Sequence, residues 1–464
     1  MDLILYDFQK NASEFIINRL KNKKPVLDCS VVGSGKTFIA LYSLLQVKKK
    51  FIIICPKIVI THWKNNINMY NLDELCIDVI NYEKIKFNKC NYYNNCNWFL
   101  PDDTIIIFDE AHRMKGYNTI NSKLLLSLDI NKYIPYLISA TIADNPISFI
   151  NVAKMLGYVK NDYSFLFQYG CKRGYENKGW IFNQDLTYLK KLHNIIFNIP
   201  NHSGVRITYD MINILNESNN IKLMFIDDIY NKISNLYKLI DNNNINNILN
   251  NNIIEYNYTD IINKIQEILL INTSSNNNII NDILFENIEE IIIKNELNIL
   301  VRRLRLKQLI ELLKAKLILN NIIDSYNNGA SIVIMFNYTF SIELMYKILK
   351  QKNYDCEIIN GNTNNKDEII NKFQNDKLRI LIINIKAAGV GISLHDITGK
   401  HNRISFISPS ESIFDLQQAL GRIYRTGTKT NTIQYIVTIK NTIEENVYYT
   451  YIKKLINMNK ILDG

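Results

Sequence analysis

The sequence predicts an α/β protein with two parallel β-sheets. Short runs of β-branched residues alternate with longer stretches of helical periodicity over residues 1–160, and the same alternation returns after residue 330. A strand of a parallel sheet is apolar along its whole length because helices cover both faces of the sheet. The chain has 464 residues, of which 47% are apolar, so two such domains and a further segment can each bury a core.

The expected strands fall into two groups along the chain. The first group comprises residues 26–29, 51–55, 75–80, 104–108 and 136–139, and the second comprises 331–336, 379–384, 403–407 and 432–438. Between the groups, apolar residues recur at helical spacing, and asparagine, which favours loops, is abundant. We therefore expect domains at residues 1–200 and 301–464, joined by a helical, Asn-rich insertion at 201–300.

Composition narrows the class of protein and its partners. The 54 Lys and Arg residues outnumber the 44 Asp and Glu residues, and the formal net charge of +10 favours a polyanionic partner. The seven cysteines are scattered, as expected for reduced thiols of an intracellular protein. Neither a signal segment nor an apolar run of ~18 residues is present, so we expect a soluble protein without a membrane partner. Only 16 residues are glycine, roughly half the usual share, which makes the position of each glycine informative.

A phosphate-binding loop is the strongest single signal. The segment SVVGSGKT follows one expected strand and opens an expected helix, and its candidate nucleotide-binding residues are Gly33, Ser34, Gly35, Lys36 and Thr37. The two glycines allow backbone N–H groups to face a phosphate at the helix N-terminus. The lysine would neutralise the β and γ phosphates of ATP, and the threonine hydroxyl would bind Mg²⁺. The strict motif has glycine where Ser30 stands, and a chance GKT in a structural turn is the alternative.

A second candidate site follows the expected strand at 104–108. The segment TIIIFDEAHRMKG places Asp109 and Glu110 at the carboxyl end of that strand, where open α/β sheets bind their ligands. Asp109 is suited to hold Mg²⁺ through its water shell, and Glu110 to orient and deprotonate the water that attacks the γ-phosphate. Two carboxylates paired with a lysine are the structural alternative. Together the two motifs predict an enzyme that hydrolyses a nucleoside triphosphate.

These motifs and their order resemble superfamily 2 nucleic-acid motors and, within them, the Swi/Snf-type translocases. In the first half the similar segments are LILYDFQKNA, IIICPKIVITHWKNNI, VINYEKI, FDEAHRMKG and LISATIADNP. In the second half they are IVIMFNYTFSIELM, INGNTNNKDEIINKFQND, ILIINIKAAGVGISLHDI, SPSESIFDLQQALGRIYRTGTKT and IKNTIEENVY. The resemblance implies two RecA-like domains and a nucleic-acid-dependent ATPase that uses ATP and Mg²⁺. Only the segment between the domains lies outside it.

The resemblance also implies roles for residues outside the two nucleotide motifs. Gln9 stands at the adenine-reading position. Arg422 and Arg425 are the candidates that reach across the domains to the transferred phosphoryl group, and their spacing predicts that they share one face of a helix. Gly391 allows close backbone approach to ATP or to nucleic acid. The residues expected to contact nucleic acid or to couple it to the nucleotide are Lys57, Ser139, Thr141, Lys386 and Gly389.

Three functions remain open at this stage. The first is an ATP-driven motor that moves along DNA, with duplex DNA favoured, and displaces what is bound there. The segment SAT, which is closer to general helicases, supports a strand-separating helicase on DNA or RNA. The third is an ATP-gated subunit of a viral or plasmid transcription complex. Thr428, where the family usually has glutamine, leaves the subfamily open, as does Ser30 in the phosphate loop. The basic cluster at 302–307 is either a solvated helix face or a nucleic-acid contact.

Overall fold

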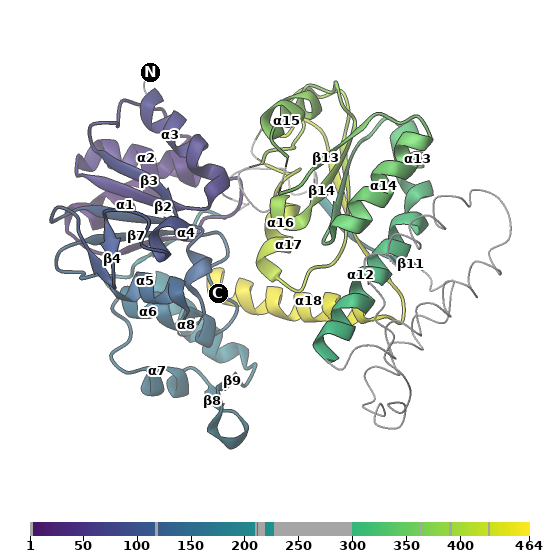
Figure 1. The fold of residues 1–464 in the computed structure, drawn as a ribbon. Helices are drawn as coiled ribbons and strands as arrows, with labels where there is room; N and C mark the ends of the chain where they lie inside the picture. The colour runs from purple at the N-terminus through teal and green to yellow at the C-terminus, as the bar shows by residue number, and fades with distance from the viewer. Residues whose placement is uncertain are drawn as a thin grey trace. The chain divides into compact units, whose positions relative to one another are not determined.

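The computed structural model of the protein describes residues 3–116, 119–208, 211, 219–226, 299–361, 363–388, 392–425 and 427–464. The chain divides into two compact units, one formed by Met1–Asn216 with Ile452–Gly464 and the other by Glu217–Tyr451. In each unit helices cover a twisted parallel sheet (Figure 1). The α/β class with two parallel-sheet domains is therefore confirmed. Within the described part of the chain, no helix is long and apolar enough to cross a membrane.

The first unit contains a six-stranded parallel sheet in the order β10–β1–β7–β6–β2–β3. Its strands are β1 (Val26–Asp28), β2 (Phe51–Cys55), β3 (Cys76–Asn81), β6 (Ile105–Asp109), β7 (Ile134–Ile138) and β10 (Gly204–Val205). Every residue of β1, β2 and β7 is buried, which is why these strands are apolar without alternation. The predicted strands of this half match the observed ones to within two residues at each end.

Eight helices surround this sheet in the described part of the first unit. They are α1 (Asp7–Lys21), α2 (Lys36–Val47), α3 (Ile60–Met69), α4 (Tyr82–Lys86), α5 (Ile120–Leu126), α6 (Pro146–Met155), α7 (Asp162–Gln168) and α8 (Leu186–Phe197). Asparagine starts several of them, because Asn81, Asn145 and Asn161 each accept a hydrogen bond from the backbone N–H three residues on. The abundant asparagine thus contributes helix caps as well as loops.

Short elements complete the first unit. They are the hairpin strands β4 (Tyr93–Asn94) and β5 (Asn97–Trp98), the hairpin strands β8 (Cys171–Arg173) and β9 (Trp180–Phe182), and the 3-10 helices η1 (Lys57–Val59), η2 (Ala111–Met114) and η3 (Tyr175–Asn177). Helix η1 leads directly into α3, and η2 directly follows the predicted carboxylate pair.

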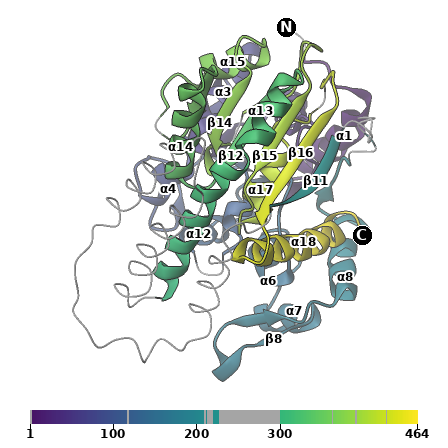
Figure 2. The ribbon, with the colours of Figure 1, turned by 90° about the vertical axis from the view of Figure 1, so that its right-hand side faces the viewer.

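The second unit repeats the plan with a parallel sheet in the order β11–β16–β15–β12–β14–β13. Its strands are β11 (Asn219–Ile226), β12 (Ser331–Phe336), β13 (Cys356–Ile359), β14 (Ile380–Asn384), β15 (Arg403–Ile407) and β16 (Thr432–Ile439). Its helices are α12 (Ile299–Leu317), α13 (Leu319–Asn327), α14 (Thr339–Gln351), α15 (Lys366–Gln374), α16 (Ile385–Ala388), α17 (Ile413–Leu420) and the first part of α18 (Ile443–Leu462). Apolar residues of α12, α13 and α14 pack with alternate residues of β12, β14 and β15, and α15, α16 and α17 lie on the other face (Figures 1 and 2).

Two segments do not follow the expected domain boundaries: the segment between the domains and the C-terminal end of the chain. Within 201–300, where helices were expected, Gly204–Val205 pairs with β1 and Asn219–Ile226 pairs with β16; most of the remaining segment lies outside the described residues. Helix α18 begins in the second unit, yet its last residues belong to the first. There Arg206 forms a two-point ion pair with Asp463, at 2.5 and 3.1 Å.

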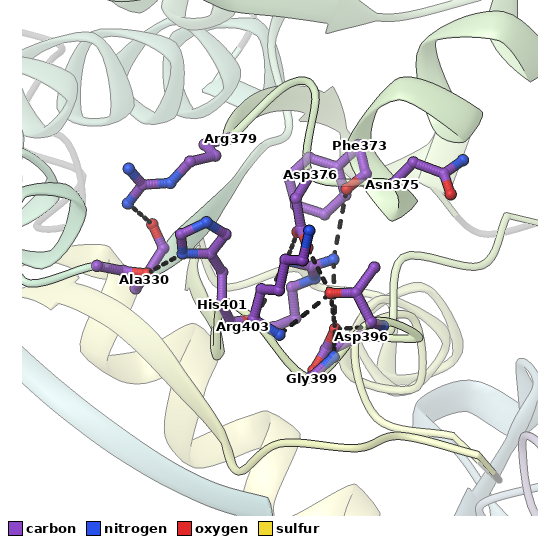
Figure 3. Close-up of polar contacts among 12 residues, drawn as sticks. Ala330, Phe373, Asn375, Asp376, Arg379, Asp396, Gly399, His401 and Arg403 are labelled. Atoms are coloured by element: carbon purple, nitrogen blue, oxygen red, sulfur yellow. Dashed lines mark hydrogen bonds and ion pairs between the residues drawn. The ribbon is translucent and has the colours of Figure 1, made fainter.

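A buried ion cluster fixes the amino end of β15 (Figure 3). Arg403 is fully buried, lies 2.8 Å from an Asp376 oxygen and 3.9 Å from an Asp396 oxygen, and stacks on the Phe373 ring. Asp396 in turn accepts the backbone N–H of Gly399. Arg403, Asp376 and Asp396 each face an opposite charge or a hydrogen-bond donor. These interactions offset the cost of removing the charged groups from water.

A second buried pair joins α12 to the carboxyl end of the same sheet. The ammonium of Lys314, fully buried, lies 2.5 Å from a Glu444 oxygen and donates to the Val437 carbonyl. Nearby, the buried carboxylate of Glu311 accepts the backbone N–H groups of Asn337 and Tyr338. These contacts tie α12 to β12, β16 and α18 within the second unit.

Candidate active site

The predicted phosphate loop lies between β1 and α2, at the carboxyl edge of the first sheet. Gly33 and Gly35 have φ of +86° and +81°, a conformation that disfavours residues with a Cβ, and Gly35 is the N-cap of α2. The Lys36 ammonium donates to the carbonyls of Ser30 and Val31, at 2.9 Å each. The lysine therefore folds over its own loop, at the helix N-terminus where backbone N–H groups favour an anion.

Ser30, which replaces the first glycine of the strict motif, has a structural explanation. Its buried hydroxyl accepts the backbone N–H of Ile207, and its own N–H donates to a carboxylate oxygen of Asp28. The adjacent Cys29 carbonyl accepts from Arg206. The first half of the loop is thus held by the segment that follows β10, and the serine side chain contributes to that attachment.

Gln9 lies beside the loop, as expected from its predicted role. Its buried side chain donates from Nε2 to the Ser34 carbonyl at 2.8 Å and accepts at Oε1 from the Tyr6 N–H at 3.0 Å. A Cβ at Gly35 would collide with Gln9 Nε2. The glutamine amide therefore occupies the space that this glycine leaves, and it links α1 to the loop.

The predicted carboxylate pair ends strand β6, on the same edge of the sheet. Asp109 accepts at Oδ2 from the Trp63 indole N–H at 2.9 Å, and at Oδ1 from the Glu110 N–H at 3.0 Å. Its carbonyl accepts from the buried Tyr82 hydroxyl at 2.7 Å. Glu110 itself has left-handed backbone, with φ of +56°, which is uncommon for a residue other than glycine, asparagine or aspartate and is frequent at functional sites.

A histidine joins this pair to the segment SAT. The Nδ1 atom of His112 lies 3.2 Å from a Glu110 carboxylate oxygen and 3.1 Å from the Ser139 hydroxyl. The Ser139 hydroxyl also accepts the Thr141 N–H, and the Ser139 N–H donates to the Asp28 carbonyl. A continuous set of hydrogen bonds therefore runs from the carboxylate pair to the strand that leads into the phosphate loop.

Burial shifts the acid–base properties of both motifs. Burial and the neighbouring Glu110 charge raise the pKa of Asp109 to about 7, against the Trp63 hydrogen bond and the Lys36 charge, which lower it. Burial lowers the pKa of Lys36, while the charges of Asp28, Glu110 and Asp109 oppose that shift. Lys36 follows β1 and the Asp109–Glu110 pair ends β6 of the same parallel sheet, so both predicted motifs lie at the carboxyl edge of that sheet, where their charges influence each other.

The residues present fit a Mg²⁺ ion that is bound together with a nucleotide. Asp109 supplies a partly buried carboxylate, and Thr37 lies in the first turn of α2. The described residues contain no group of three or more His, Cys, Asp or Glu side chains arranged to hold a metal by themselves. Mg²⁺ normally takes one or two carboxylates and completes its shell with phosphate oxygens and water, so this sparse donor set suits it.

The two predicted arginines lie in the second unit, and the expectation that they share a helix face is wrong. Helix α17 ends at Leu420, with Gly421 as its C-cap, so both arginines follow it in a turn and loop. Arg422 is buried and donates to the Ile392 carbonyl at 3.2 Å, whereas Arg425 donates to the Ser393 hydroxyl at 2.6 Å. The segment at 392–393 therefore orients both guanidinium groups.

The remaining predicted contacts have different environments. Lys57, in η1, and Lys386, in α16, are exposed. Ser139 and Thr141 are buried, and the Ser139 hydroxyl contacts His112. Gly389 and Gly391 lie outside the described residues. In the basic cluster, Lys307 forms an ion pair with Glu411.

Several site residues escaped sequence reasoning. Asp28 ends β1 beneath the phosphate loop, and Tyr82 holds the carbonyl of Asp109. Trp63 lies in the segment IIICPKIVITHWKNNI, whose resemblance to the family implies no role for it. A carboxylate that ends a buried strand was a readable signal for Asp28. Nothing in the sequence indicates that Trp63 and Tyr82 meet Asp109, because 46 and 27 residues separate the partners.

Two family models match the chain, and each covers one of its domains. Residues 2–143 match the model described as the type III restriction enzyme res subunit, and residues 309–427 match the helicase conserved C-terminal domain. The first range contains the phosphate loop and the carboxylate pair, and the second contains both arginines.

Curated relatives extend the similarity. A protein named putative ATP-dependent RNA helicase L364, from Acanthamoeba polyphaga mimivirus, is 29% identical over 99% of this chain and 84% of its own length. The early transcription factor 70 kDa subunit of fowlpox virus is 30% identical over 39% of this chain, and the DNA repair and recombination protein RAD54 of Saccharomyces cerevisiae is 27% identical over 29%. The matches span only 27% and 15% of those two proteins.

One solved structure also aligns along the chain. The alignment with the Sulfolobus solfataricus SWI2/SNF2 ATPase core in complex with dsDNA includes 99% of this chain and 93% of that chain, with 18% identity and a TM-score of 0.38. That score is too low to add weight to the assignment, which depends on the family models, the curated relatives and the two nucleotide motifs. The chain belongs to the superfamily 2 helicases and ATPases, and the Swi/Snf-type branch within them stays a prediction from the sequence.

Proposed function

We propose that this chain hydrolyses ATP to move along duplex DNA and to displace or remodel what is bound there. The observation that carries the proposal is that Lys36, after β1, and the Asp109–Glu110 pair, at the end of β6, lie at the carboxyl edge of one parallel sheet. A phosphate-binding loop beside a metal-binding carboxylate and a candidate base is the equipment of an ATPase. The relatives named for DNA repair, together with the net charge of +10, favour DNA as the polymer that is tracked.

Each residue of the first domain has a proposed task. Backbone N–H groups at Gly33–Gly35 and the Lys36 ammonium bind the phosphates, and Gln9 binds the adenine. Mg²⁺, held by Thr37 and Asp109, would neutralise charge on the phosphate oxygens. Glu110 orients the attacking water and takes its proton, while its contact with His112 holds the carboxylate in place.

The second domain supplies the proposed positive charge for the transferred phosphoryl group. Arg422 and Arg425 are held by Ile392 and Ser393, which fixes their direction before the reaction and reduces the entropy lost on binding. Hydrolysis then requires both domains, so the nucleotide state controls their separation. The exposed Lys57 and Lys386 are proposed to hold the DNA backbone, and the buried Ser139 and Thr141 to couple that grip to Glu110 through His112.

Two other functions have specific support. The segment SAT, together with a relative named as an RNA helicase, favours strand separation on DNA or RNA. The fowlpox virus relative, named as an early transcription factor subunit, favours an ATP-gated subunit of a viral transcription complex. Transcription or replication proteins are the partners that these alternatives imply.

ATP turnover with different polymers separates the three functions. We expect the purified chain to turn over ATP faster with duplex DNA than with single-stranded DNA, RNA or no polymer, and to release little displaced strand. Efficient strand displacement would favour the helicase, and equal turnover in all four conditions would favour the gated subunit. Glu110→Gln should abolish turnover but retain ATP binding, whereas Glu83→Gln, which changes an exposed carboxylate of the same domain, should behave as wild type.

A further inference from the structure

The β8–β9 hairpin is a feature of the first unit that the nucleotide site does not use. It follows α7 and lies with it at the end of the unit beyond α6 and α8, as two views agree (Figures 1 and 2). The chain has only 16 glycines, yet Gly170, Gly174 and Gly179 fall within ten residues here. Such a concentration in a glycine-poor chain indicates backbone conformations or close approaches that residues with a Cβ disfavour.

One face of the hairpin packs against α7. Arg173 and Trp180 are paired in register across the two strands, and the Arg173 guanidinium lies over the rings of both Tyr163 and Trp180, at 4.5 and 4.3 Å. Phe167 meets the Trp180 ring edge-on, with 5.3 Å between centroids. The guanidinium is thus clamped between aromatic rings, so the hairpin is fixed against α7 and its charge is held at the surface.

The outer face and the tip are exposed. Lys172 and Ile181 are paired in register and both point away from the packed face. At the tip, Tyr175 is 86% exposed and Lys178 is also exposed.

The tip backbone is also constrained. A Cβ at Gly174 would collide with the Lys178 carbonyl oxygen, and Gly179 has φ of +68°. The Tyr175 ring therefore projects from a tight turn, and Gly174 and Gly179 allow the backbone to make that turn.

The charge of this region selects the partner. Residues 154–191 contain seven basic and three acidic residues, a surplus of four within a chain whose total is +10. Asp162 pairs with Lys154, and Asp185 caps α8. Lys178 pairs with Glu176, but both side chains are exposed, so this ion pair contributes little and a phosphate can replace the carboxylate. A basic surface with an exposed ring matches a strand of nucleotides, whose phosphates are anionic and whose bases stack.

We propose that the β8–β9 hairpin is a second nucleic-acid contact, in which Lys172 and Lys178 bind phosphates and Tyr175 stacks on a base of an unpaired strand. This contact rests on the proposed function, since it requires that the chain bind nucleic acid at all. It goes beyond that function, because the motor is proposed to move along duplex DNA and this contact would hold unpaired nucleotides outside its two sheets. Arg173 acts through its clamp, which orients the strand that carries Lys172.

Anisotropy of labelled DNA tests the contact in the full-length chain. The probes are an oligodeoxythymidylate of about 20 nucleotides, longer than the ~4–16 nucleotides of a single-strand site, and a duplex of the same length. We expect Tyr175→Ala to weaken single-strand binding about tenfold and Tyr175→Phe to restore it. Lys172→Glu combined with Lys178→Glu should lower the slope of log affinity against log salt by about 1.4 for single strands.

Matched controls come from the same unit. Phe99→Ala removes an aromatic ring that is 60% exposed, and Lys132→Glu reverses an exposed charge; both should bind as wild type. All variants should retain the wild-type circular dichroism and ATP turnover without DNA. If the hairpin variants bind both probes with wild-type affinity and salt slope, the hairpin does not contact nucleic acid, and the proposed function still stands. A hairpin that binds a protein partner instead would give this result. A wild-type chain that binds neither probe would reject the proposed function together with the hairpin contact.

Discussion

The two domains share a fold, but the carboxylates at the nucleotide motifs of the first are held differently from the two ion pairs that join elements of the second. In the first, the carboxylates of Asp28 and Asp109 accept hydrogen bonds from neutral groups, namely a backbone N–H and the Trp63 indole. In the second, Arg403 and Lys314 are each paired with carboxylates, Asp376 and Glu444. A buried charge without an opposite charge at contact distance is costly, and it can still attract a charged ligand. A charge that is already paired cannot do so as strongly. The comparison therefore distinguishes a binding site from a structural ion pair.

The largest expected effect comes from exchanging Lys36, which is partly buried, and Lys314, which is fully buried, for methionine one at a time. Lys36→Met removes the proposed phosphate ligand, so turnover should fall by about 10²- to 10³-fold, as for other donors aimed at developing charge. Because burial opposes the charged form of Lys36, folding should be retained or improved. Steady-state turnover and thermal unfolding measured on one preparation check both halves. Wild-type turnover in Lys36→Met would remove the lysine from the site.

Lys314→Met should have the reverse signature. It leaves the Glu444 carboxylate buried without its partner, which costs about 3–5 kcal/mol when one member of a buried pair is removed. All three tryptophans, Trp63, Trp98 and Trp180, lie in the first unit, so their fluorescence follows that unit in urea, while hydrogen exchange follows the second. We expect the second unit alone to lose stability. Equal loss in both units would show that the pair does not act locally.

Sequence reasoning succeeded where structure depends on short-range pattern. Buried parallel strands are apolar throughout, so β2, β12 and β15 were placed at their observed bounds, and the phosphate loop was fixed by the demand for glycine. It failed where partners are distant. The expected helix through Arg422 ends earlier because Gly421 caps it and the arginine turns toward Ile392. Likewise, β11 forms only by pairing with a strand more than 200 residues away.

The pH dependence of Asp109→Asn gives a smaller effect that tests the charge comparison directly. In the folded protein the pKa of Asp109 is raised to about 7, from 3.8, so the folded wild type binds a proton that the unfolded chain releases. Stability of the first unit should therefore fall as pH rises from about 4 to about 7, by on the order of 4 kcal/mol at most. Asparagine cannot ionise, so its advantage should grow over that range and level off above it. A constant difference in tryptophan fluorescence melts between pH 4 and 8 would contradict the shift.

Trp63→Phe is expected to have the smallest effect and the most specific one. Phenylalanine keeps most of the buried ring but removes the N–H that donates to Asp109, and a hydrogen bond to a charged group contributes roughly 1.5–3 kcal/mol. Without it the carboxylate form is less favoured, so the acid limb of the turnover profile should move to higher pH, and more Mg²⁺ should be needed for half-maximal rate.

Trp98→Phe is the matched control, because that indole donates to the Ser127 hydroxyl instead. It removes an N–H from the same unit without touching a carboxylate, so it should change stability but neither the pH profile nor the Mg²⁺ requirement. If the two variants shift both quantities alike, Trp63 acts only through packing. If Trp63→Phe alone shifts them, the neutral donors of the first domain hold Asp109 ready for a cation, whereas the paired charges of the second domain join its helices and strands.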